Sequence, residues 1–353
     1  MSGNAARANA RWGFLKAPFG TGKLLWIVSD ANINSVRLGA ELTQAIRQKR
    51  LDVRLALTFE HEYPDQLQSL LSLEKTGLGY TSCDHPLAVQ RVLQRLNPFA
   101  IIFTGAPPKP NLSRALSAVR HSMVIAAANE HHVDAKFEHV YPATESQAQT
   151  WHSSVVSPVV DFFSLLSAGQ VDPNFKSLVN GSRERRLWWL HCSDSKRARS
   201  FIGQFRSQFC DDVLFVSGVN ELDEAINIKT WARTPLPPGA LVWVDELKWL
   251  PAIAASVQAV HFADFNSALF WQAMGGGGAV SCSAEVCLPK KNLIDAVEIL
   301  WSSSAILETW QVYCNNPILM RSRADAARRR FWEERRLAST LNATLLQTIF
   351  DWD

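Results

Sequence analysis

The sequence predicts an α/β protein with two doubly wound domains. Apolar segments of strand length alternate with amphipathic segments of helix length, a pattern typical of parallel sheets covered by helices on both faces. The chain of 353 residues is too long for one hydrophobic core, so two domains of about 150 residues are expected. We predict Rossmann-like domains over residues 1–150 and 185–353, joined by a linker region over 151–184 and facing a shared cleft.

The first half of the chain carries one series of these segments. Helices are predicted at residues 36–50, 64–75, 87–96 and 111–120. Strands are predicted at residues 23–30, 52–59, 77–86, 98–105 and 122–129. In the first helix, Leu38, Leu42 and Ile46 recur at helical spacing and form one apolar face.

The second half carries another series. Strands are predicted at residues 185–194, 211–218, 240–246, 257–264 and 277–283, with helices at 196–208 and 266–274. The break between the two series lies within residues 145–184, where Ser, Gly and Pro are more frequent. Ligands of doubly wound sheets bind outside the carboxyl ends of the strands, so polar residues after each strand are the candidates for a site.

Composition excludes several classes of protein. A hydrophobic content of 47% with 20% charged residues is ordinary for a globular protein and argues against disorder. The six Cys show no CxxC pair, which predicts reduced thiols. His131, His132 and Asp134 come nearest to a metal cluster, but sequence neighbours seldom converge on one ion. No apolar segment has the length of a membrane span, so we expect a cytoplasmic protein. We also expect that the protein uses neither a metal nor a cofactor.

An arginine-rich stretch near the C-terminus, "RSRADAARRRFWEERR" (321–336), has two interpretations. It is either a solvated helix face or a patch that docks to phosphate-bearing lipid or nucleic acid. We expect a peripheral membrane or acceptor contact and no nucleic-acid partner. The candidate residues of this patch are Arg321, Arg323, Arg328, Arg329 and Arg330.

Five stretches share their order and spacing with one family of enzymes. They are "RWGFLKAP…LLWIVSDAN" (11–32), "YTSCDHPLAVQRVLQRLNPFAIIFTGAPPKPNLSRAL" (80–116), "SMVIAAANE" (122–130), "TPLPPGALVWVDELKWLPAIAASVQAVHFAD" (234–264) and "FNSALFWQAMGGGGAVSCS" (265–283). Matching residues within them include Tyr80, Asp84, Pro86, Pro110, Asn111 and Leu112. On these stretches the chain resembles the bacterial 3-deoxy-D-manno-octulosonic acid (Kdo) transferases over most of residues 11–345.

The resemblance implies a glycosyltransferase of GT-B type that uses a CMP-activated sugar. Such an enzyme moves Kdo or a similar sugar onto a lipid A-type or surface-glycan acceptor, so a nucleotide sugar and a lipid or glycan are the implied partners. The family's N-terminal membrane anchor has no counterpart in this chain. We therefore expect a surface patch to bring the protein to the inner face of the inner membrane.

The chain departs from the family at the expected general base. The family has Ser-Val-Gly-Glu after its first strand, whereas this chain has "ANINS" (31–35), with Asn34 or a near neighbour at the Glu position. An amide cannot take a proton at neutral pH, and Asp30 is the only carboxylate nearby. Asp30 and Asn34 are therefore the candidate catalytic residues. Alternatively, these side chains cap the following helix.

The nucleotide-sugar site is expected in the second domain, at helix N-termini, where backbone N–H groups and the helix dipole bind anions. The family's Pro-Arg-His is "SGVN" (217–220) here, and "ADFNSALF" (263–270) keeps only one Asn of the family's motif. Glu246 either binds ribose hydroxyls or caps a helix, and the "GGGG" stretch either lets backbone approach a ligand or is only a flexible turn between helix and strand. The candidate residues are Ser193, Ser195, Lys196, Asn220, Glu246, Asn266, Ser267, Gly275 and Gly276.

Three functional hypotheses remain open from the sequence. The first is a Kdo-transferase-like enzyme that uses a CMP-sugar. The second is a catalytically inactive homologue that binds a partner or scaffolds envelope-glycan assembly, because several functional side chains are replaced at once. The third is a transferase for a UDP- or GDP-sugar.

Overall fold

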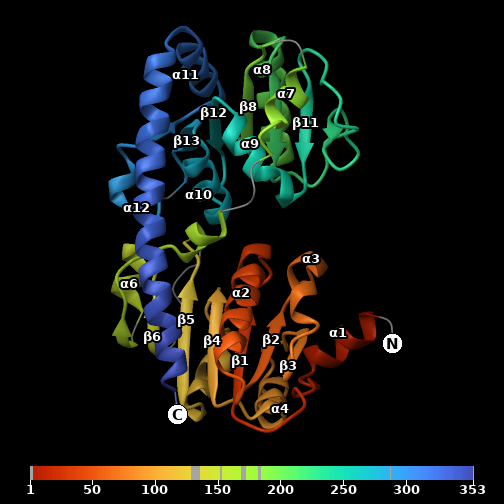
Figure 1. The fold of residues 1–353 in the computed structure, drawn as a ribbon, viewed down its shortest axis with the longest axis vertical. Coiled ribbons are helices and arrows are strands. Elements are labelled where there is room, and N and C mark those ends of the chain that lie inside the picture. Colours follow the sequence, from red (N-terminus) through yellow and green to blue (C-terminus); the bar gives the residue numbers. More distant parts are fainter. Residues whose placement is uncertain are drawn as a thin grey trace. The chain divides into compact units, whose positions relative to one another are not determined.

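The computed structural model forms two compact α/β units, each built on a seven-stranded parallel sheet (Figure 1). It describes residues 3–128, 136–151, 153–167, 172–181, 184–286 and 288–352. Unit 1 comprises Met1–Leu166 with Leu337–Asp353, and unit 2 comprises Ser167–Arg336. The predicted fold class, two doubly wound domains, is confirmed. The paired histidines at 131 and 132, with Asp134, lie outside the described residues.

The sheet of unit 1 has the strand order β3-β2-β1-β4-β5-β6-β7. Its strands are β1 Leu24–Ser29, β2 Arg54–Phe59, β3 Thr76–Tyr80, β4 Ala100–Gly105, β5 His121–Ala126, β6 Phe137–Tyr141 and β7 Ser153–Val156. The central strands β1 and β4 are buried along their whole length, because helices cover both faces of the sheet. Strand β7 lies in the region that the sequence analysis treats as a linker, and it pairs with β6 instead.

Three of the helices described in unit 1 begin at a residue whose side chain caps the helix. The helices of this unit are α1 Gly3–Arg11, α2 Ile33–Lys49, α3 Pro64–Leu67, α4 Pro86–Leu96, α5 Pro110–Ala115 and α6 Glu145–Thr150, with short 3-10 turns at Gln68–Leu70, Leu116–Ala118 and Phe162–Ser167. Asn32 caps α2 by accepting a hydrogen bond from the Asn34 amide. Asn97 ends α4 in the left-handed conformation, with a φ of 44°.

The sheet of unit 2 has the strand order β10-β11-β9-β8-β12-β13-β14. Its strands are β8 Leu187–His191, β9 Val213–Ser217, β10 Ile226–Asn227, β11 Leu241–Val244, β12 Ala259–Phe262, β13 Ala279–Ser283 and β14 Val297–Leu300. Its helices are α7 Phe175–Asn180, α8 Ser195–Gln208, α9 Leu250–Ser256, α10 Ser267–Gly276, α11 Ser303–Asn315 and α12 Pro317–Phe350, with 3-10 turns at Leu247–Trp249 and Lys291–Leu293. None of the helices in the described residues combines the length and apolar character needed to cross a membrane.

Two neighbouring tryptophans in β8 anchor the two faces of this second sheet. Because successive side chains of a strand point to opposite faces, Trp188 and Trp189 enter different cores. Trp188 stacks on Trp310 of α11, with ring centroids 4.7 Å apart. Trp189 packs edge-on against Phe262 on the other face, at 5.8 Å. Both faces of the sheet at β8 are thereby shielded from water, and only the polar carboxyl end of the strand can face a ligand.

The long helix α12 contributes to both units. Its buried Phe331 belongs to the core of unit 2, whereas the chain after residue 336 belongs to unit 1. There, Arg50 donates a hydrogen bond to the Phe350 carbonyl at 2.7 Å, and Trp352 stacks on His121 with centroids 5.0 Å apart. The expectation that residues 185–353 form one domain is thus corrected for the last 17 residues, which pack on unit 1 through these contacts.

Trp352→Ala is expected to lower the free energy of unfolding of unit 1 by about 3 kcal/mol, because it removes a large buried ring from the end of the chain. Trp352 follows the end of α12 and is 5% exposed, whereas Trp332 on α12 is 58% exposed, so Trp332→Ala is the control. Urea denaturation measures both variants. The control should change the unfolding free energy by less than about 0.5 kcal/mol. Equal effects of the two substitutions would contradict the assignment of the C-terminus to unit 1.

Candidate functional site

Each sheet has one point where the strand order reverses, and a pocket lies at each of these points. In unit 1 the order reverses between β1 and β4, and in unit 2 between β8 and β12. At such a switch point the loops after the two strands diverge to opposite faces of the sheet and leave a crevice outside the strand ends. The fold therefore provides two candidate sites, one in each unit, and each is described by itself.

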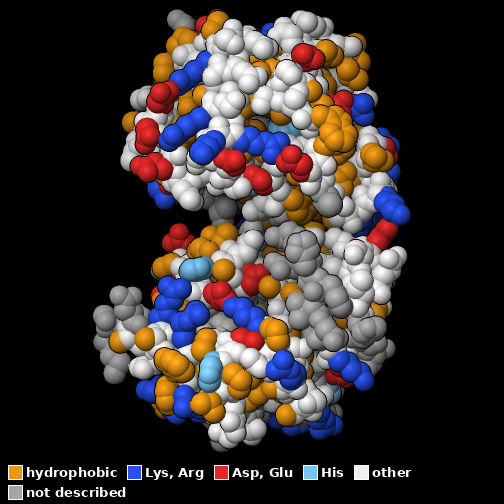
Figure 2. Space-filling view, turned by 180° about the vertical axis from the view of Figure 1, so that it is seen from behind, with side chains coloured by type: hydrophobic (Ala, Val, Ile, Leu, Met, Phe, Trp, Pro, Cys, Tyr) orange, Lys and Arg blue, Asp and Glu red, His pale blue; other side chains and the backbone are white. Residues whose placement is uncertain are grey.

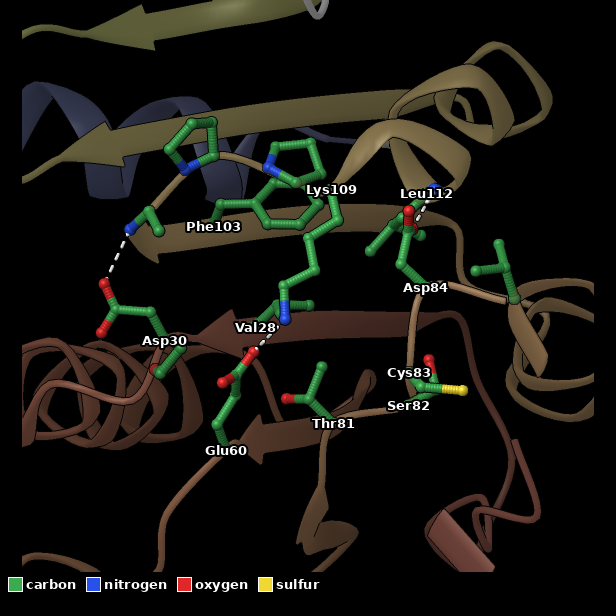
Figure 3. A pocket seen from close by; sticks show the side chains of 15 residues that line it. Val28, Asp30, Glu60, Thr81, Ser82, Cys83, Asp84, Phe103, Lys109 and Leu112 are labelled. Carbon is green, nitrogen blue, oxygen red and sulfur yellow. Dashed lines mark hydrogen bonds and ion pairs between the residues drawn. The ribbon is translucent and has the colours of Figure 1, made fainter. Parts of the chain in front are cut away.

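The pocket of unit 1 lies at the carboxyl ends of β1, β2, β3 and β4 (Figure 3). It is small, with a volume of about 60 Å³, and its floor is apolar where Val28 and Phe103 lie. Lys109 reaches across the opening to Glu60, with Nζ and Oε1 2.6 Å apart. These two residues are not among the sequence candidates, although Glu60 directly follows a predicted strand and Lys109 stands in "TGAPPKPN".

Asp30 joins the two loops that border this pocket. Its Oδ1 accepts a hydrogen bond from the Asn32 amide at 2.7 Å, and its Oδ2 accepts one from the Ala106 amide at 2.9 Å. Burial raises the pKa of the Asp30 carboxyl above its ordinary value, and these hydrogen bonds oppose that shift. Both oxygens are thus engaged in holding the turn after β1 to the turn after β4.

The structure brings only one of the two predicted catalytic residues to the pocket. Asp30 is part of the lining, whereas Asn34 is 5% exposed in the first turn of α2 and does not line the pocket. Asp84, at the opposite side, accepts hydrogen bonds from the Asn111 and Leu112 amides, both at 3.0 Å. Its carboxylate therefore binds the first backbone amides of α5, although the capping alternative in the sequence analysis was made for Asp30 and Asn34 only.

Asp30→Asn is expected to lower the free energy of unfolding by about 1–2 kcal/mol, because an amide oxygen can serve only one of the two backbone N–H groups. Denaturant unfolding at neutral pH measures the change. Asp65→Asn is the control, since Asp65 is an exposed residue of the same unit. Equal stability of Asp30→Asn and wild type would contradict the bridging role.

The Asp30 carboxyl should also leave a signature in the pH dependence of stability. Its pKa is higher in the folded protein than the ordinary value of 3.8, so the folded state holds this proton more tightly than the unfolded chain. The part of its stability contribution that comes from the bound proton is therefore fully present below pH 3.8 and is lost as the pH rises through the folded pKa, while the hydrogen bonds to the two backbone amides remain. Unfolding curves of wild type and Asp30→Asn from pH 3.5 to about 7 should show this loss in the wild type alone. A parallel pH dependence would contradict the raised pKa.

The pocket of unit 2 is larger, with a volume of about 400 Å³. It is bordered by the ends of β8, β9 and β11 and by the start of α10. Val219, Leu250 and Leu269 give it an apolar wall, while His191, Asn220, Asp245, Glu246 and Asn266 supply polar groups. Its size lies in the range of sites for small molecules and nucleotides, about 300–1,000 Å³.

Two lysines neutralise the acidic residues of this pocket. The Lys229 ammonium lies 2.8 Å from the Asp245 carboxylate, and the Lys248 ammonium lies 2.5 Å from that of Glu246. The hydrogen bond to Asp245 raises the pKa of Lys229. In the upper half of the face in Figure 2, basic and acidic side chains also lie next to one another. The acids at the pocket rim can therefore meet ligand hydroxyl groups without a large net negative field.

Three of the predicted nucleotide-binding residues line this pocket, namely Asn220, Glu246 and Asn266. Asn266 caps α10, its side chain accepting a hydrogen bond from the Leu269 amide at 3.2 Å. The N-terminus of α10, which is the positive end of its dipole, therefore opens at the pocket. Ser267 is the first residue of this helix and is buried beside Asn266, outside the lining.

The other predicted phosphate position, at the start of α8, is arranged differently. The Asp194 carboxylate accepts hydrogen bonds from the Lys196 and Arg197 amides, at 2.8 and 3.3 Å. This carboxylate occupies the place where the N-terminus of a helix would bind a phosphate. Ser193 donates its amide hydrogen to Asp264, at 2.6 Å. Ser193, Ser195 and Lys196 do not line the pocket of unit 2.

The glycines of the "GGGG" turn lie at the opposite end of α10 from the pocket. A Cβ on Gly275 would come within 2.8 Å of the Phe331 ring, and one on Gly276 within 2.3 Å of the Ala254 carbonyl. These positions are glycine because α9 and α12 pack closely there. The expectation that Gly275 and Gly276 bring backbone to a ligand is corrected to a packing role.

The arginines of the predicted membrane patch lie on α12, within unit 2. Arg323 pairs with Glu298 at 3.3 Å, and Arg330 pairs with Asp295 at 2.6 Å. The hydrogen bonds of Arg330 lower the pKa of Asp295. Such pairs fit a solvated helix face, the first of the two interpretations of this stretch.

The sequence analysis missed three polar residues of the pocket, namely His191, Ser217 and Asp245. His191 ends β8 and Ser217 ends β9, and both are buried, at 6% and 3% exposure. Burial lowers the pKa of His191 to about 4. The available signal was a histidine at the carboxyl end of the apolar run "LWWLH", within the predicted strand 185–194.

Comparisons with known proteins identify structural relatives but no sequence family. No protein-family model matches the chain, and no curated protein sequence matches it. HepE from Anabaena, solved with UDP and glucose, matches with a TM-score of 0.59 and 10% identity, covering 94% of this chain and 100% of HepE. MnaA from S. aureus, solved with UDP, matches with a TM-score of 0.59 and 9% identity, covering 86% and 91%.

A third structure is the UDP-GlcNAc 2-epimerase from Neisseria meningitidis bound to UDP-GlcNAc. Its TM-score is 0.55 at 10% identity, and the match covers 92% of this chain and 100% of the epimerase. At these identities the likeness shows the fold alone. The two Rossmann-like units are of GT-B type, and none of these three structures is a Kdo transferase.

Proposed function

We propose that the protein binds a UDP-sugar in the pocket of unit 2 and transfers its sugar to an acceptor held by unit 1. The observation that carries the proposal is this pocket, which joins an apolar wall, acidic groups and a helix N-terminus at the switch point of the sheet. The structural relatives solved with UDP or UDP-GlcNAc share the fold over most of their length and support the choice of nucleotide.

Each part of a nucleoside diphosphate sugar has a suitable counterpart in the pocket. Leu250 and Leu269 offer an apolar surface to the base. Glu246, at the end of β11, can accept hydrogen bonds from ribose hydroxyls. The N-terminus of α10 beside Asn266 suits the diphosphate, because its amides and dipole favour negative charge.

The UDP-sugar hypothesis is preferred over the CMP-Kdo hypothesis. No relative reported above contains CMP or Kdo, whereas three of them contain UDP or UDP-GlcNAc. The family residues that would handle Kdo transfer are also replaced in this chain, above all by Asn34 at the expected base. A GDP-sugar is the alternative donor, and the binding experiment below distinguishes it from a UDP-sugar.

The acceptor is proposed to lie at the pocket of unit 1, where Asp30, Glu60 and Asp84 place three carboxylates (Figure 3). A base near the acceptor hydroxyl is needed for transfer. The raised pKa of Asp30 suits proton uptake, and Asp30 is the proposed base.

The acceptor is proposed to be lipid-linked. A second pocket of unit 1, about 900 Å³ in volume, lies between α1, α3 and β3 and is lined mainly by apolar side chains. Phe14 and Leu71 line it and are 48% and 75% exposed. Arg91 and Arg95 lie over the Phe14 ring, at 5.2 and 5.5 Å. Hydrophobic and basic side chains also lie side by side in the lower half of the face in Figure 2. Apolar groups beside cations suit an acyl chain with an anionic head group.

A second candidate function is binding without catalysis. It is favoured by one observation, namely that both oxygens of Asp30 already accept backbone hydrogen bonds. A carboxylate used in this way holds the two loops together and has less freedom to take a proton from an acceptor. In that case the protein would retain nucleotide affinity and show no turnover.

Titration calorimetry with UDP, CMP and GDP tests the nucleotide assignment. UDP is expected to bind, with CMP and GDP at least about 10-fold weaker. Glu246→Gln should weaken UDP binding by about 10-fold, since it loses a charged acceptor for the ribose hydroxyls. Glu285→Gln is the control, because Glu285 is an exposed residue of unit 2 outside the pocket. Absent UDP binding, or equal loss in both variants, would contradict the proposal.

Incubation of the protein with UDP-GlcNAc and a lipid-linked sugar that carries free hydroxyl groups as acceptor, followed by NMR of the sugar, separates the two candidate functions. Release of UDP is expected for a transferase, and Asp30→Asn should slow it by at least about 100-fold, in line with loss of a general base. An unchanged UDP-GlcNAc spectrum despite binding would support the binding protein. Appearance of the 2-epimer would instead indicate an epimerase and contradict sugar transfer.

A further inference from the structure

His191 occupies a special position in the pocket of unit 2. It is the last residue of β8, at the switch point, and it lines the pocket although the residue is only 6% exposed. The ring packs against Phe262, with centroids 5.5 Å apart. Its Nδ1 lies 3.0 Å from the Ser217 hydroxyl. No hydrogen-bond partner of its Nε2 is found among the residues that the structure describes.

A chain of hydrogen bonds decides which ring nitrogen carries the proton. The Trp189 indole N–H can only donate, and it donates to the Ser217 hydroxyl oxygen at 2.9 Å. The Ser217 hydroxyl, 3% exposed, must then donate its own hydrogen, and His191 Nδ1 is the acceptor within reach. The opposite arrangement would bury a hydroxyl hydrogen without an acceptor, which is unfavourable. The proton of His191 therefore resides on Nε2.

The ring is neutral at physiological pH. Burial lowers the pKa of His191 to about 4, against the opposing charge of Asp264. The other charged groups of the pocket are Asp245 and Glu246, each paired with a lysine. None of the described residues that line the pocket is a lysine or an arginine. A diphosphate in this pocket would thus meet uncharged donors, and the Nε2–H of His191 is a preorganised one.

We propose that His191 determines specificity for the diphosphate, donating a hydrogen bond from Nε2 to a diphosphate oxygen of the nucleotide sugar. Ser217 and Trp189 are positioning residues, since they hold the tautomer that presents this hydrogen. The inference rests on the proposed function, because it takes the UDP-sugar as the ligand of this pocket.

The proposal has a consequence for the pH dependence of binding. A diphosphate next to His191 adds negative charge, which raises the pKa of the ring in the complex, in the same direction as Asp264. UDP-GlcNAc should therefore bind more tightly as the pH falls from about 7.5 to 5, because binding takes up a proton. The diphosphate of this sugar ester does not itself titrate in that range. A variant without an ionisable ring at position 191 should lose this dependence.

The tautomer can be measured without any ligand. In the wild-type protein labelled with nitrogen-15 at histidine, NMR should show a protonated Nε2 and an unprotonated Nδ1 for His191. Ser217→Ala should remove this preference. Ser281→Ala is the matched control, because Ser281 is a buried serine bonded to another histidine of the same sheet, His261, outside the pocket. A protonated Nδ1 in the wild type would overturn the proposal. This measurement uses the wild-type protein alone, so it does not depend on whether any variant folds.

Two amide substitutions test the donor itself. The amide nitrogen of His191→Gln stands near the place of Nε2, whereas that of His191→Asn stands near Nδ1. Calorimetry with UDP-GlcNAc should show His191→Asn about 10- to 100-fold weaker than wild type, with His191→Gln closer to wild type. Equal affinity of wild type and both variants would overturn this inference and leave the proposed function standing. A wild-type protein that binds neither UDP nor UDP-GlcNAc would overturn both.

Discussion

Parallel pairing of every strand in each sheet is the constraint on which both candidate sites depend. It brings the carboxyl ends of the strands, and the polar turns that follow them, to one edge of each sheet. Reversal of the strand order then opens a crevice beside β1 and β4 and another beside β8 and β12. The buried tryptophans of β8 close both faces of the second sheet, so polar chemistry in unit 2 is concentrated at this edge.

The sequence predicted the central strands because strands covered on both faces are continuous apolar runs, as in "LLWIVS" and "LWWLH". It missed the peripheral strands for physical reasons. Strand β10 has two residues, and β14 is half-buried along most of its length, so neither carries a strong pattern. The return of the C-terminal residues to unit 1 depends on contacts such as that of Trp352 with His121, which no local pattern encodes.

The candidate sites were predicted in part, by the rule that polar residues after parallel strands gather at one edge. Asp30, Glu246 and Asn266 follow that rule and line pockets. The rule could not show that the Asp194 carboxylate binds the free amides at the start of α8, where a phosphate would otherwise bind. Nor could it show that Gly276 is required for helix packing. It also could not identify His191, whose proposed role rests on a hydrogen-bond chain through Ser217, 26 positions away in the sequence.

The central claim is that a UDP-type nucleotide binds at the strand ends of unit 2. Hydrogen exchange measured by mass spectrometry, with and without saturating UDP, tests it most directly because it locates the site within the chain. The account predicts slower amide exchange in the turn at residues 217–220 and in the first turn of α10, with no change at the strand ends of unit 1. Slower exchange around Asp30 and Lys109 instead, or no change anywhere, would contradict it.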